Sequence, residues 1–87
     1  MIINTEDLKK KIIYRSSYRG TIEMDKLLSS FTKNYINSFD KEELFLLSNL
    51  LEHEDENLYR FNQNKDTSIK IEKNKISDLF RNFKLKV

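Results

Sequence analysis

The sequence has no cysteine and no proline, and it contains a single glycine among its 87 residues. Without cysteine the chain cannot form a disulfide, a thiolate metal site or a cysteine nucleophile. Average usage would supply about six glycines in a chain of this length. Because a many-stranded sandwich or barrel needs a turn every ~8–12 residues, this shortage of turn-forming residues favours a helical fold.

Long apolar runs are missing as well. No stretch approaches the roughly 18 consecutive apolar residues that identify a transmembrane helix, and the first residues lack the pattern of a secretory signal peptide. We therefore expect an intracellular protein that does not insert into a membrane. One domain is usual at this length, so we expect a single helical domain over residues 1–87, with its core in about residues 5–83.

No strong excess of either charge is present, since 16 basic and 14 acidic residues leave a net charge of +2. The three consecutive lysines at positions 9–11 would spread around a helix at roughly 100° per residue and form no single stripe. Nucleic-acid-binding domains carry a concentrated basic patch, so we expect a solvated surface here and no nucleic-acid partner. The alternative that stays open is a small helical regulatory or nucleic-acid-associated module that uses these lysines with Lys84 and Lys86.

Five segments have the features of helices, at about residues 5–18, 21–38, 41–53, 56–62 and 68–83. The second has the strongest apolar period, carried by Met24, Leu27, Leu28, Phe31 and Tyr35. Residues 68–72 alternate as a strand would, but a lone strand has no partner here, so we interpret them as the start of the fifth helix. Short connections favour antiparallel neighbours. The sequence therefore predicts a compact all-α bundle of five helices.

The expected helix ends carry residues suited to capping. Good N-cap residues precede three of the helices: Asn4 or Thr5, Asp40 with Glu43 three residues on, and Asp55. Gly20 stands just past the first helix. We expect it to adopt the left-handed conformation with which a glycine closes the last turn of a helix.

The reactive side chains of the sequence do not suit an enzyme. The one histidine, His53, lies beside Glu52 and Glu54 near an expected helix end, where an imidazole usually supports the helix dipole. Glu23 and Asp25 are two residues apart and so lie on different faces of a helix, which makes them a poor acid–base pair. One histidine cannot form a typical transition-metal site, and one glycine cannot form a glycine-rich phosphate loop. We expect no catalytic residue and no metal site.

The segment from Tyr14 to Asp25 (YRSSYRGTIEMD) differs from the rest of the chain. It gathers two of the four arginines, two tyrosines and two carboxylates around the only glycine. Arginine and tyrosine dominate the energetics of protein interfaces, and a glycine lets another backbone approach closely. Glu23 could hold the Arg19 guanidinium or accept hydrogen bonds from a partner. From the residues alone, an interaction surface and a helix end with a surface ion pair are equally good interpretations.

Two blocks of the sequence resemble the SdhE family of FAD assembly factors. The first is Arg19-Gly20-x-x-Glu23, with Tyr14-Arg15-Ser16 before it and Met24-Asp25, Leu27-Leu28 and Phe31 after it. The second is Leu50-Leu51-Glu52, followed by Asp55, Leu58-Tyr59 and Phe61. The two blocks stand at the separation usual in the family, and the resemblance covers about residues 8–83.

The resemblance implies a five-helix fold and a role that is not enzymatic. Members of this family, which occurs in bacteria and mitochondria, bind the flavoprotein subunit of succinate dehydrogenase and promote covalent attachment of FAD to a histidine of that client. For this chain we expect the bacterial cytoplasm as the compartment, and it stays open whether a fumarate reductase-type homologue is a further client. The FAD belongs to the client, and the lack of a dinucleotide fingerprint agrees with that. The contacts implied for the partner are Arg19, Gly20 and Glu23 at the centre, with Arg15, Tyr18 and Asp25 as neighbours.

Overall fold

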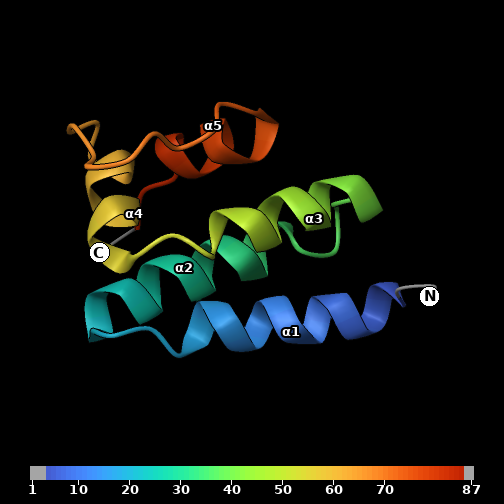
Figure 1. Ribbon diagram of the computed structural model, residues 1–87. Coiled ribbons are helices and arrows are strands. Elements are labelled where there is room, and N and C mark those ends of the chain that lie inside the picture. Colours follow the sequence, from blue (N-terminus) through green and yellow to red (C-terminus); the bar gives the residue numbers. More distant parts are fainter. Residues whose placement is uncertain (1–3, 86–87) are drawn as a thin grey trace.

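The computed structural model describes residues 4–85 and contains five helices. They are α1 (Thr5–Ser17), α2 (Ile22–Tyr35), α3 (Lys41–Leu50), α4 (Asp55–Asn62) and α5 (Lys75–Asn82). Helix α1 packs against α2 and α3, and α5 packs against α3 and α4. In Figure 1, α1 lies on one side of the α2–α3 layer and α4 and α5 lie on the other. The predicted all-α, five-helix architecture is confirmed.

The core is built from the apolar stripe of α2 and the residues that face it. Phe31 is fully buried, and its ring lies edge-on to Phe80 at 5.3 Å and to Phe83 at 5.4 Å. Edge-to-face packing is a favoured arrangement of aromatic rings. The other apolar side chains with no exposed surface are Ile12, Leu28, Leu44, Leu47, Leu58, Ile76 and Phe80. Each contributes roughly 1.5–3 kcal/mol through its burial.

Two of the predicted caps are present, and one is wrong. Asn4 accepts a hydrogen bond from Glu6 N–H, and Asp40 and Glu43 form the expected capping box at the start of α3. The N-cap of α4 is Glu54 rather than Asp55, and its side chain makes no capping hydrogen bond. Asp55 is instead the first residue of α4, and its carboxylate bonds to another part of the molecule.

The predicted start of the fifth helix at residue 68 is also wrong. Helix α5 begins at Lys75, because the Asn74 side chain accepts hydrogen bonds from the N–H groups of Ile76 and Ser77. In return, Ser77 Oγ accepts a hydrogen bond from the Asn74 N–H. Residues 69–73 are not helical. They form a connection without regular secondary structure, in which Ile71 is buried and Ile69 is exposed.

Gly20 does not adopt the left-handed conformation predicted for it. No glycine in the described part of the chain has a positive φ. Helix α1 ends at Ser17, and Tyr18 forms its C-cap. The backbone conformation at position 20 is therefore one that a residue with a side chain can also adopt. Separately, no helix within residues 4–85 is both long and apolar enough to cross a bilayer.

Candidate partner-binding site

The turn between α1 and α2 is held by an arginine that points into the molecule. Arg19 Nε donates to Asp55 Oδ1 at 2.7 Å, and its Nη atoms donate to the carbonyls of Leu51 at 3.0 Å and His53 at 2.9 Å. A further bond from Nη1 reaches the Arg15 carbonyl at 3.3 Å. The Arg19 side chain is only 12% exposed. This guanidinium thus ties the α1–α2 turn to the α3–α4 turn.

Asp55 uses both of its carboxylate oxygens in this arrangement. While Oδ1 accepts from Arg19, Oδ2 accepts from the Gly20 N–H at 2.8 Å. A Cβ atom added at Gly20 would lie 3.3 Å from Oδ2. A side chain at this position would therefore require the Asp55 carboxylate to shift by a few tenths of an ångström. We call the set Arg19, Gly20 and Asp55 the clasp.

Asp25 holds the same turn from the other side. Its Oδ1 accepts from the Arg19 N–H at 2.5 Å, so the backbone of the turn is fixed by one carboxylate from α2 and one from α4. The suggested Glu23–Arg19 ion pair is wrong, since Asp55 occupies the guanidinium. Three of the predicted contact residues, Arg19, Gly20 and Asp25, thus have roles within the fold that explain their identity.

The side chains that the turn presents to solvent are largely apolar. Tyr18 is 71% exposed and Ile22 is 69% exposed, although neither polarity nor charge would place them there. The Tyr14 ring lies 4.7 Å from the Tyr18 ring. Arg15, which follows Tyr14 in the sequence, pairs with Glu52 at 3.0 Å. Large exposed aromatic and aliphatic side chains that gather at one place are typical of interaction surfaces.

Glu23 is a predicted contact residue whose side chain is available to a partner. It is exposed in the first turn of α2. Within residues 4–85 its carboxylate makes no ion pair and no hydrogen bond. It lies beside Tyr59 of α4, which is 45% exposed. The site therefore combines a rigid turn, exposed apolar side chains and one carboxylate without a partner.

Comparison with known proteins assigns the family. The family model described as "flavinator of succinate dehydrogenase" matches residues 10–84. The chain belongs to this family. It is the family that the two sequence blocks resemble, and both blocks lie within the matched residues. All six predicted site residues, from Arg15 to Asp25, lie there too.

Several curated relatives are similar to parts of this flavinator-family chain, and each is named "Succinate dehydrogenase assembly factor 2, mitochondrial". The protein of Debaryomyces hansenii is 41% identical over 54 residues, which cover 61% of the chain and 38% of the relative. That of Lodderomyces elongisporus is 38% identical over 66 residues, 74% of the chain and 40% of the relative. The protein of Drosophila virilis is 40% identical over 43 residues, which cover 49% of the chain and 27% of the relative. The chain thus spans less than half the length of these relatives, and no solved structure matches it.

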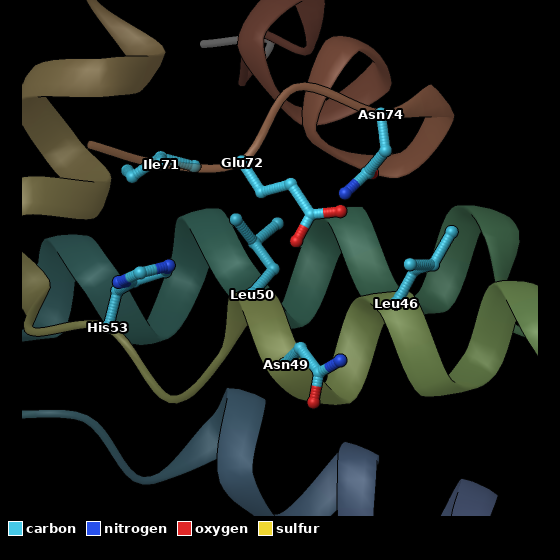
Figure 2. Close-up of a pocket in the computed structure, with 7 residues that line it drawn as sticks. All are labelled: Leu46, Asn49, Leu50, His53, Ile71, Glu72 and Asn74. Atoms are coloured by element: carbon cyan, nitrogen blue, oxygen red, sulfur yellow. The ribbon is translucent and has the colours of Figure 1, made fainter.

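A small pocket between α3 and the segment before α5 is lined by His53, the one histidine of the sequence. The third helix was expected to reach residue 53, but α3 ends at Leu50, so His53 lies beyond the helix. His53 lines the pocket with Asn49 of α3 and with Glu72 and Asn74 of the segment before α5. Figure 2 shows His53 at one end and Asn74 at the other, with the Glu72 side chain reaching toward α3. No group of three metal-ligating side chains that could hold an ion occurs in the part of the chain that is described.

The lysines at positions 9–11 do not form a concentrated basic surface. Lys9 is half-buried and lies 3.7 Å from the Glu6 carboxylate on the same helix, whereas Lys10 and Lys11 are exposed. This arrangement is the solvated helix surface that the sequence predicted.

Sequence reasoning missed Asp55 and the exposed residues Ile22 and Tyr59 as parts of the site. Asp55 stood in the second sequence block, but it lies 36 residues from Arg19, and helical periodicity carries no information at that separation. Tyr59 was assigned to the fourth helix without a surface role. Ile22 is an apolar residue in the first turn of its helix, but it lies outside the apolar stripe of that helix. This position is the signal that could have identified it as a surface contact.

Proposed function

We propose that this chain binds the flavoprotein subunit of succinate dehydrogenase and promotes covalent attachment of FAD to a histidine of that subunit, without acting as an enzyme. The observation that carries the proposal is the family match over residues 10–84. The relatives that share the sequence are named as assembly factors of the same complex. The site supports a binding role, because its exposed groups are suited to contact with another protein rather than to chemistry.

The physical mechanism is alignment of the client. Covalent flavin attachment is chemistry of the flavin and of the client's own residues. A bound factor lowers the entropic part of the barrier when it stabilises a client conformation in which the reacting atoms are already oriented. A rigid surface does this best, since it loses little freedom on binding. The clasp of Arg19, Gly20 and Asp55 provides that rigidity for the turn.

The contacts that we assign to the client are those on the outer side of the turn. Glu23 supplies a carboxylate, Tyr18 and Ile22 supply apolar area, and Arg15 with Glu52 supplies a polar edge. The Gly20 backbone lies at the surface between them. Arg19 and Asp25 act on the client indirectly, by holding the turn.

FAD is proposed to belong to the client. A dinucleotide site uses N–H groups of a glycine-rich turn between a strand and a helix to hold the pyrophosphate. In this chain the one glycine already donates its N–H to Asp55, so its residues do not fit such a site. We propose the bacterial cytoplasm as the compartment, and a fumarate reductase-type flavoprotein as a further client.

Reconstitution tests the proposal. The purified flavoprotein subunit is incubated with FAD, with and without the factor, and covalent flavin is measured by in-gel fluorescence together with co-purification of the two proteins. We expect a complex and faster accumulation of covalent flavin with the factor. A client that gains flavin at the same rate in both samples, with no complex, would refute the proposal.

A further inference from the structure

A shallow groove runs between α2 and α4, next to the turn. Two hollows in the surface share Glu23 and Tyr59, so together they form one continuous depression. We call it the α2–α4 groove and define it by Glu23, Met24, Leu27, Glu56, Tyr59 and Leu85. In the view of Figure 1, α4 lies above the N-terminal half of α2. Its length from Glu56 to Gln63 is two turns of α4, or about 10 Å at 1.5 Å per residue.

One end of the groove is acidic. Glu23 and Glu56 are exposed residues of the first turns of α2 and α4. Neither forms an ion pair within residues 4–85, whereas the neighbouring Asp55 is occupied by Arg19. Favourable interaction with the helix dipoles accounts for acids at these positions. Since neither carboxylate has a cationic partner among residues 4–85, both can attract a cation from outside.

The rest of the groove is apolar. Met24 and Leu27 are core residues whose edges line it, and Tyr59 and Leu85 stand half-exposed beside them. Lys84, which borders the far end, already donates hydrogen bonds to carbonyls of Asn62 and Arg81. The groove therefore presents negative charge at one end and an apolar surface along the remainder.

We infer that the α2–α4 groove binds a segment of the client flavoprotein that carries a lysine or arginine beside an apolar side chain. The basic residue pairs with Glu23 and Glu56, and the apolar residue packs on Tyr59 and Leu85. An extended segment covers about 10 Å in three residues, so one short stretch of the client reaches both ends. This inference rests on the proposed function. It is supported by charge complementarity and by continuity with the turn, since Glu23 belongs to both surfaces.

Binding measurements with matched variants test the groove. The affinity for the purified flavoprotein subunit is measured for Glu23→Gln and Tyr59→Ser, each of which we expect to weaken it about tenfold or more, as central interface residues do. The first control is Glu42→Gln, a change in the first turn of α3, away from the groove. The second is Ile69→Ser, which alters an apolar side chain as exposed as Tyr59. Both controls should bind as the unchanged protein does, and circular dichroism should give the same melting temperature for Tyr59→Ser and Ile69→Ser within a few degrees.

The outcomes separate the groove from the proposed function. If the unchanged protein binds the flavoprotein and the groove variants bind equally well, the groove inference is refuted and the proposed function stands. If the unchanged protein does not bind the flavoprotein at all, both are refuted.

A photo-crosslinker placed at position 59 identifies the occupant. We expect it to capture a flavoprotein peptide with a basic residue within three positions of an apolar one. A captured peptide without a basic residue, or capture of a second copy of this chain, would overturn the inference.

Discussion

Removal of the Asp55 carboxylate tests the central feature of the site. In Asp55→Ala, Arg19 loses its charged acceptor and the Gly20 N–H loses its partner. A hydrogen bond to a charged group contributes about 1.5–3 kcal/mol. The Arg19 side chain, which is only 12% exposed, would then carry a largely buried charge without a carboxylate partner. It would keep three carbonyl acceptors. Because Asp55 itself is 25% exposed, water offsets part of the loss, and we expect a destabilisation of about 2–3 kcal/mol.

This loss is large for a chain of 87 residues. Stabilities of about 0.05–0.15 kcal/mol per residue give a total of roughly 4–13 kcal/mol. The melting temperature should therefore fall by about 10–20 °C, since 1 kcal/mol corresponds to about 4–8 °C in a domain of this size. Urea unfolding followed by circular dichroism measures the free energy directly.

The matched control is Glu52→Ala. It removes the other ion pair at the same junction, between Arg15 and Glu52 at 3.0 Å, whose side chains are 34% and 64% exposed. Exposed pairs contribute about 0–1 kcal/mol, so this variant should stay close to the unchanged protein. If Asp55→Ala lost no more stability than Glu52→Ala, the clasp would not be the rigid element that the proposed mechanism requires.

Three further changes examine the turn, the pH response and the last helix. Gly20→Arg should keep the helical circular dichroism spectrum but abolish flavoprotein binding, because its side chain displaces the Asp55 carboxylate; an unfolded variant would show that Gly20 is needed for the fold itself. The hydrogen bond from Lys75, at 2.5 Å, and that from Asp40 N–H lower the pKa of Glu43 below its ordinary 4.5. Ionised Glu43 should thus stabilise the protein fully above pH 4.5, and this stabilisation, which Glu43→Gln lacks, should vanish as the pH falls through the lowered pKa. Urea unfolding of both proteins along a pH series measures the difference in unfolding free energy. A difference that stays constant with pH would contradict the linkage. Asn74→Ala should destabilise by about 1 kcal/mol, read from urea unfolding; no loss would mean that the capping box does not fix the start of α5.

How far the sequence predicts this structure depends on the range of each interaction. The capping box of Asp40 and Glu43 is complete within four residues, so its pattern was sufficient to place the start of α3. Asn74 and Ser77 carry the same local signal for α5. The prediction did not use this signal and took the alternating residues 68–72 as the start of the helix, whereas residues 69–73 form a non-helical connection that buries Ile71. The five-helix fold was therefore predictable, and one boundary was misplaced by seven residues.

The candidate site was less predictable, because its main bonds cross between distant segments. Arg19 could pair with any of several carboxylates, and the nearest in sequence, Glu23, was the natural choice. The choice of Asp55 depends on how α4 follows α3, which brings the first residue of α4 to the α1–α2 turn. The reason for Gly20 was equally hidden, since the carboxylate that crowds it lies 35 residues away.

The Arg19-Gly20-x-x-Glu23 motif therefore contains two kinds of residue. Arg19 and Gly20 face Asp55 and fix the turn, whereas Glu23, three residues further on, lies on the exposed side of α2. Substitutions of the first two should destabilise the protein as Asp55→Ala does, and they should also weaken binding of the flavoprotein. Arg19→Lys belongs with them, because one ammonium cannot match the planar fork that reaches the carboxylate and the carbonyls. Glu23→Gln should weaken binding alone, so a comparison of unfolding and affinity across these variants separates the residues that build the surface from the residue that contacts the client.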